Sequence, residues 1–208
     1  MVRVTCTLRD DGAKFNPLLF QEAYDRRKLE RKLTLLASGR ALPRAEVDLR
    51  PILVPTPATA PGPLYRWFDQ LLADAEVGAI FNWDDNVAHE SRQRVWSDDV
   101  TFWGDGRIDL RRANVDVLEA MLEDIGPGLA KLLLAPAPAD RSANALQAAL
   151  VPIDAEIRQR VAARLTYDAM RYAITIDTAA GGDHRRWYVV ARIDSGEVDI
   201  LHRSQLTW

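Results

Sequence analysis

Acidic and amide side chains gather between residues 82 and 99, where their oxygen atoms could hold a metal ion. The group consists of Asp84, Asp85, Asn86, Glu90, Asp98 and Asp99. Calcium takes about six to eight oxygen ligands from such clusters of carboxylates and carbonyls. The spacing is not that of an EF-hand loop. The stretch is a candidate calcium site with Asp84, Asp85 and Glu90 as ligands; the alternative is that these side chains cap helices and solvate a loop.

A second candidate site is the Ile-Gly-Pro-Gly turn at residues 125–128. It separates two segments with apolar residues at helical spacing, so it predicts a helical hairpin. In a helix-hairpin-helix, backbone N–H groups of this turn would face a phosphate, and Lys131 would assist. That interpretation assigns nucleic-acid contacts to Gly126, Gly128 and Lys131. The alternative is a hairpin packed into the core without a ligand.

Residues for catalysis are scattered along the chain. The three histidines are His89, His184 and His202, and no spacing unites one of them with a nucleophile and an orienting group. One cysteine and dispersed histidines argue against zinc. We therefore predict that the protein is not an enzyme. The enzymatic alternative would require a pocket that gathers Asp84, Asp85 or His89.

Composition limits the remaining functions. The chain has 208 residues, 48% of them hydrophobic and 27% charged, which is typical of a globular protein with a real core. A net charge of −3 argues mildly against non-specific nucleic-acid binding. The sequence contains neither a signal peptide nor an apolar run long enough to span a bilayer. The lone Cys6 has no partner for an internal disulfide.

Periodicity predicts the elements that must position these residues. A strand is expected over 2–8, and a helix from Asn16-Pro17 to Ser38. The basic residues of this helix are expected on a solvated face; they are Arg26, Arg27, Lys28, Arg31 and Lys32. Six prolines between residues 42 and 63 exclude a helix or a central strand there. Further expected elements are a strand around 101–110, helices over 114–125, 129–134, 143–150 and 152–165, and a three-stranded meander over 168–202.

These elements predict an α+β fold. We expect residues 1–16, 101–110 and 166–208 to form one antiparallel sheet. Residues 17–100 would form a helical insertion in it, and residues 111–165 a helical hairpin portion.

Four segments, taken in order, resemble the general secretion pathway protein K family, the large minor pseudopilins of type II secretion systems. The first is GDGRIDL followed by R-x-A-N-x-x-V-L-x-x-M-L, at residues 104–122. The others are RDDGAKFN at 9–16, NWDDN at 82–86 with Glu90 behind it, and the closing strands at 167–208. The resemblance spans nearly the whole chain and concerns the soluble region of such a protein. The leader and the long apolar helix with which a pseudopilin begins are not in this sequence.

The resemblance implies a structural role. It suggests a pilin-like sheet with a large inserted all-helical domain of the sterile-alpha-motif or helix-hairpin-helix kind. It also implies a position at the pseudopilus tip, on the periplasmic face of the inner membrane, with other minor pseudopilins as partners. Some members of the family bind calcium, which favours the candidate calcium site. Without the pilin helix, we expect part of one sheet face to be apolar and either partly exposed or covered by a partner.

Overall fold

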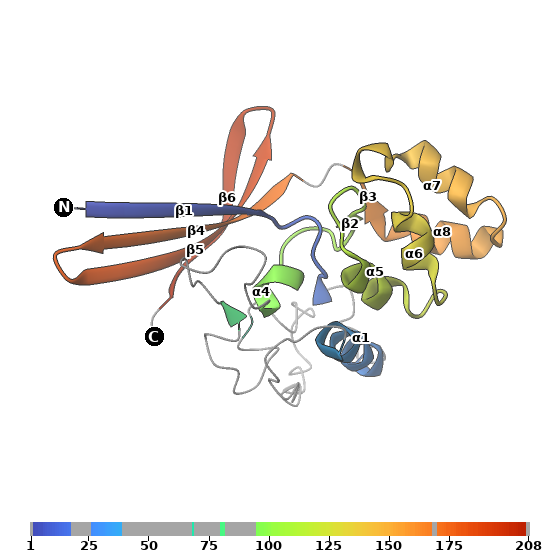
Figure 1. Cartoon of the computed structure of the whole chain (residues 1–208), viewed down its shortest axis with the longest axis horizontal. Helices are drawn as coiled ribbons and strands as arrows, with labels where there is room; N and C mark the ends of the chain where they lie inside the picture. Colours follow the sequence, from blue (N-terminus) through green and yellow to red (C-terminus); the bar gives the residue numbers. More distant parts are fainter. Residues whose placement is uncertain are drawn as a thin grey trace, which may run out of the picture.

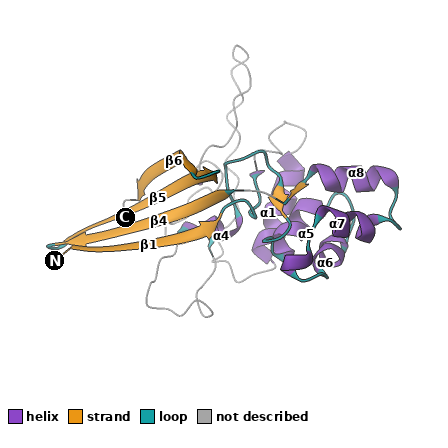
Figure 2. Ribbon diagram, turned by 90° about the horizontal axis from the view of Figure 1, so that it is seen from above, coloured by secondary structure: helices purple, strands orange, loops and turns teal. Residues whose placement is uncertain are grey.

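The computed structural model describes residues 2–17, 26–38, 68, 80, 81, 95–167 and 170–206. Sheet and helices lie at opposite ends of the molecule (Figure 1). The N-terminus lies at the far tip of the sheet, and the helices cluster at the other end (Figure 2).

The main sheet has four antiparallel strands in the order β1-β4-β5-β6. These are β1 (Val2–Asp10), β4 (Arg171–Ala180), β5 (Asp183–Asp194) and β6 (Glu197–Leu206). The predicted meander is therefore present as β4, β5 and β6, and β1 pairs with β4 along its whole length. Gly181 and Gly182 both adopt positive φ, 57° and 92°, which suits the two-residue turn that joins β4 to β5.

Residues 101–110 do not join this sheet, contrary to the prediction. Only Ile108–Asp109 form a strand, β2, which pairs in parallel with β3 (Leu165–Thr166) in a separate two-stranded sheet. The reason lies in the preceding turn, where Gly104 and Gly106 have φ of 97° and 82° and turn the chain away from an extended path. Phe102 meanwhile enters the hydrophobic core.

The helices between β2 and β3 follow the predicted pattern closely. They are α5 (Val115–Leu122), α6 (Leu129–Leu134), a 3₁₀ turn at Pro138–Asp140, α7 (Ala143–Leu150) and α8 (Ala155–Ala163). Asn114 caps α5 as predicted, accepting a hydrogen bond from the Val117 N–H at 2.9 Å. The last helix begins later than predicted because Asp154 caps it, accepting from the Glu156 N–H at 2.8 Å.

Of the expected helical insertion over residues 17–100, the structure describes α1 (Arg26–Ser38), α4 (Trp96–Asp99) and residues 68, 80 and 81. Helix α1 ends at Ser38 as predicted and buries Leu29, Leu33 and Leu36. The insertion as a whole extends outside the described residues and stays a prediction.

One core connects the sheet to the helices. Aromatic rings form its centre at the sheet: Phe68 packs edge-on against Phe81 and Phe102, with centroids 5.3 and 5.0 Å away. The ring of Phe81 lies 5.0 Å from that of Tyr188 on β5. Because this core covers one face of the sheet, the two sheet faces have different environments.

Candidate functional site

The sheet face opposite the core is apolar and open; we call it the open face. Side chains alternate along a strand, so the register defines which residues share it. Its apolar members are Val2, Val4, Cys6 and Leu8 on β1, Ile174 and Ile176 on β4, Trp187, Val189, Ala191 and Ile193 on β5, and Val198 and Ile200 on β6.

Exposure is greatest along both edges of the open face. Val4 and Leu8 on β1 are 61% and 56% exposed, and Ile200 on β6 is 65% exposed. Ile174 and Ile176 between them are half-buried. Single exposed apolar residues are ordinary, but a contiguous apolar surface marks an interaction site. The predicted apolar and partly exposed sheet face is thus confirmed.

Arg203 places a positive charge on the open face, on the edge strand β6. The Arg203 guanidinium on β6 lies over the Trp187 ring, 4.4 Å from its centroid. Such a cation–π contact attracts the guanidinium to the face of the ring. Arg203 also lies opposite Val189 in the strand register, so its charge has apolar neighbours on β5.

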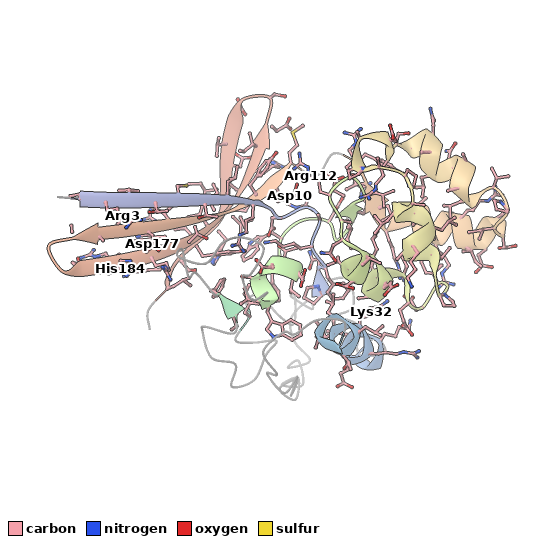
Figure 3. The ribbon with its side chains drawn as sticks, in the orientation of Figure 1. Arg3, Asp10, Lys32, Arg112, Asp177 and His184 are labelled. Atoms are coloured by element: carbon pink, nitrogen blue, oxygen red, sulfur yellow. The ribbon has the colours of Figure 1, made fainter. Side chains whose placement is uncertain are left out.

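A second arginine, Arg112, lies at the end of the open face that is nearest the helices. Arg112 binds the Asp10 carboxylate, and its guanidinium lies 5.8 Å from the centroid of Tyr172. Asp10 and Tyr172 are register partners on β1 and β4. Hydrogen bonds to Asp10 and Tyr172 raise the pKa of Arg112 above its ordinary value, so its positive charge is permanent. Figure 3 shows Arg112 and Asp10 at the junction between the sheet and the helices.

Beneath the sheet, a buried polar cluster joins β1 to the chain around residue 101. Lys14 Nζ lies 2.9 Å from Asp11 Oδ1, and the Thr101 hydroxyl donates to Asp11 Oδ2 at 2.5 Å. Burial disfavours the Lys14 ammonium, but the Asp11 carboxylate outweighs this and raises the pKa of Lys14. Burial raises the pKa of the neighbouring Tyr188 phenol. Lys14 and Asp11 belong to the RDDGAKFN segment, whose polar residues therefore fasten the sheet to its core.

A second buried cluster fastens the helices to one another. Lys32 Nζ lies 2.6 Å from Asp124 Oδ1 and donates to the carbonyls of Ala120 and Met121 at 2.8 and 3.1 Å. Arg164 binds both carboxylate oxygens of Asp124, at 2.6 and 2.8 Å. Burial alone would raise the pKa of Asp124, but Arg164 and Lys32 hold it well below the usual range. The predicted solvated position of Lys32 is wrong, because the end of α5 requires donors for its free carbonyls.

The candidate calcium ligands Asp84, Asp85 and Glu90 lie outside the described residues, as does His89. In the described ranges, no group of three or more His, Cys, Asp or Glu residues is arranged to hold a metal ion. Asp98 and Asp99, from the same acidic stretch, have structural contacts. Asp98 binds Arg9 and accepts from the Val95 N–H at 3.1 Å, while Asp99 accepts from the Asn114 side chain at 3.3 Å. Calcium binding stays a prediction.

The candidate phosphate-binding turn lies between α5 and α6. The N–H groups of Ile125 and Gly126 both donate to the Leu122 carbonyl, at 2.9 and 3.1 Å. Gly128 has φ of 80°, and Lys131 is exposed on α6. Two of the N–H groups that a phosphate would need are therefore used to end α5.

The remaining histidines lie on the core face of the sheet. His184 Nε2 lies 2.8 Å from Asp177 Oδ1, and His202 packs against Trp103 with 4.7 Å between ring centroids. Burial lowers the pKa of the His202 imidazole. In the part of the chain described, no helix has the length and apolar character needed to cross a membrane.

The fold is pseudopilin-like by comparison with a solved structure. The chain is similar to a chain in the crystal structure of the GspK-GspI-GspJ complex from the enterotoxigenic Escherichia coli type 2 secretion system, with a TM-score of 0.50. The two are 14% identical, and the match covers 99% of this chain and 80% of that chain. No protein-family model matches the sequence, and no curated protein matches it. At this identity the similarity describes the fold.

Proposed function

We propose that this protein is a structural minor pseudopilin of a type II secretion system, assembled with other minor pseudopilins at the tip of the pseudopilus. The observation that carries the proposal is the open face of the sheet. An apolar surface that extends from β1 to β6 is stabilised when another element covers it, by roughly 25 cal/mol for each Å² of apolar surface removed from water. Assembly into a complex provides such cover.

The chemistry of the open face favours a different chain as the partner. Among the described strand residues of this face, the carboxylates are Asp10 and Asp183, which already bind Arg112 and Arg185. If two copies of this chain paired through their open faces, each Arg203 would be buried without a carboxylate, which is unfavourable. A partner with an apolar surface would cover the open face, and one acidic side chain opposite Arg203 would pair with its charge.

The buried polar clusters support a structural role. Asp11, which pairs with Lys14, also accepts a hydrogen bond from Thr101, and Lys32 pairs with Asp124. Both clusters join segments that are about 90 positions apart in the sequence, and their charges are paired within the fold. Breaking such a buried pair is strongly unfavourable, so each pair fixes the arrangement of the elements it joins. We propose a non-enzymatic function on this ground, at the periplasmic face of the inner membrane, where pseudopilins assemble.

The test is co-purification with the counterparts of GspI and GspJ from the same organism. Leu8→Asp and Ile200→Asp place a charge on the open face at exposed positions, so the fold should tolerate them. We expect each to weaken the complex by about tenfold or more, because a buried charge without a partner is costly. Val151→Asp is the matched control, since Val151 is 66% exposed but lies beside α7.

Loss of the complex in the two sheet variants, with retention in Val151→Asp, would support the proposal. Equal binding by all three variants would refute it. The helix-hairpin-helix alternative makes a different prediction: duplex DNA would bind, more weakly as salt rises, and Lys131→Ala would reduce the salt dependence. We expect no such binding, since the N–H groups of Ile125 and Gly126 are engaged within the hairpin.

A further inference from the structure

A hollow of about 410 Å³ lies at the tip of the sheet, far from the helices. It is lined by Arg3 on β1 and by residues 179–184 around the β4–β5 turn. Arg3, Ala179 and His184 are register partners across β1, β4 and β5. Ala179 has a small side chain and lies between Arg3 and His184, whose side chains are long. The space above Ala179 therefore forms the hollow. Figure 3 shows Arg3 and His184 at this end of the sheet, with Asp177 between them.

His184 has a defined orientation on one side of the hollow. Its Nε2 lies 2.8 Å from Asp177 Oδ1, so the other ring nitrogen faces away from that carboxylate. Asp177 Oδ2 accepts from Arg186 Nε at 2.8 Å and from a second nitrogen of the same guanidinium. The Asp177 carboxylate is thus matched by Arg186 and oriented towards two partners, which reduces its repulsion of an anion.

Arg3 provides a positive charge at the hollow that no acidic side chain neutralises among the described residues. Among the residues that the structure describes, none forms a hydrogen bond or ion pair with its guanidinium. Asp183, the other acid at the hollow, lies 3.0 Å from Arg185 Nε and is matched by it. The charges around the hollow are therefore Arg3, the Asp177–Arg186 pair and the Asp183–Arg185 pair. Their sum is positive.

Glycine backbone forms the third side of the hollow. Gly181 and Gly182 have no side chains, and no other atom lies within 4 Å of where a Cβ would stand on either residue. Main-chain atoms at the turn are therefore open to a ligand. Side-chain donors consequently approach the hollow from β1 and β5, and main-chain atoms from the turn. A phosphate presents acceptor oxygens in several directions, whereas a carboxylate has two in one plane, so this arrangement favours a phosphate.

We propose that this hollow binds a phosphate group, with Arg3 and His184 as its side-chain contacts. The forked guanidinium of Arg3 would hold two oxygens, as arginine does in other phosphate sites. The phosphate could belong to a free ion or to the headgroup of an anionic lipid, since both present the same oxygens. This site is separate from the open face and does not depend on the proposed assembly function.

The first experiment titrates the whole chain with inorganic phosphate in low salt, using isothermal calorimetry. We expect saturable binding with one site. Arg3→Ala should weaken it by about tenfold or more, since hydrogen bonds to charged groups are strong. Arg3→Lys should give an intermediate loss, because the charge stays but the fork is removed. His184→Gln should also weaken binding, because it removes the imidazole that lines the hollow.

Arg192→Ala is the matched control. It removes the same charge from β5, but Arg192 pairs with Asp199 at the other end of the strand, outside the hollow. Thermal unfolding of every variant shows that the fold is retained. Equal weakening by Arg192→Ala and Arg3→Ala would overturn the site, because binding would then follow net charge alone.

Flotation with vesicles distinguishes the two sources of phosphate. Vesicles of phosphatidylglycerol should bind the protein in an Arg3-dependent manner if the ligand is a lipid headgroup, and phosphatidylcholine vesicles are the control. Binding to inorganic phosphate alone would assign the site to a free phosphate. Failure to bind inorganic phosphate and phosphatidylglycerol vesicles would refute the proposal.

Discussion

Lys32 on α1 and Asp124 beyond the end of α5 form an ion pair, with 2.6 Å between Nζ and Oδ1, although the Lys32 side chain is inaccessible to solvent. The pair connects residues 92 positions apart in the sequence. Lys32 also donates to two carbonyls at the end of α5, so its position depends on the tertiary contact of the two helices.

We expect Lys32→Met to destabilise the protein by about 3–5 kcal/mol, because Asp124 and the α5 carbonyls would lose a buried partner. Denaturant unfolding measures this change. Arg31→Met is the control: Arg31 lies 2.6 Å from Glu123, but its side chain is 72% exposed. An exposed pair contributes about 0–1 kcal/mol. Similar losses in the two variants would contradict the structural importance of Lys32.

Gly104 should be sensitive to substitution. A Cβ at this residue would collide with the Arg171 guanidinium, and φ is 97°. Gly104→Ala should therefore lower the melting temperature more than Gly128→Ala, which has φ of 80° but open space around it. The strain at Gly128 alone is about 1–2 kcal/mol. The difference between the variants isolates the displacement of Arg171; equal effects would show that Arg171 moves aside freely.

Stability should fall as the pH drops below about 6.5, the ordinary pKa of a histidine imidazole. Burial lowers the pKa of His202 in the folded chain, so the unfolded chain takes up the proton first and is favoured. Denaturant unfolding at pH 7.5 and 5.5 measures the loss, and His202→Phe should reduce it. Asp124 acts in a separate window: its lowered pKa contributes stability that is lost below about pH 3.8. An unchanged pH dependence in His202→Phe would count against this assignment.

We propose that the acidic stretch containing Asp84, Asp85 and Glu90 binds calcium. Removing calcium with a chelator should then lower the melting temperature, and adding it back should restore the value, since a ligand that binds the folded state stabilises it. Asp84→Asn with Asp85→Asn should abolish the response. Magnesium is the control, because it prefers a smaller octahedral site. A melting temperature indifferent to calcium would end this hypothesis.

Local rules predicted many elements correctly. Asn114 caps α5, the helix at residues 143–150 has its predicted bounds, and the meander follows its period of two. Each depends on neighbours in the sequence. Prediction was wrong for residues 101–110, where the alternation of Ile108 and Leu110 indicated a longer strand in the main sheet. Alternation shows that a segment is half-buried, but it does not identify the strand with which it pairs.

The sequence by itself determined the α+β class, the apolar stripe of each helix and the alternation that makes one sheet face apolar, because these follow from residue type and spacing. The tertiary structure decided which charges are buried and which strands pair. Lys32 looked like a member of a solvated basic face until α5 brought unsatisfied carbonyls and Asp124 to it. Arg3 and His184 are 181 positions apart in the sequence. They line the same hollow because β1 pairs with β4 and β4 pairs with β5. Such contacts depend on long-range pairing, which residue spacing along a single chain does not encode.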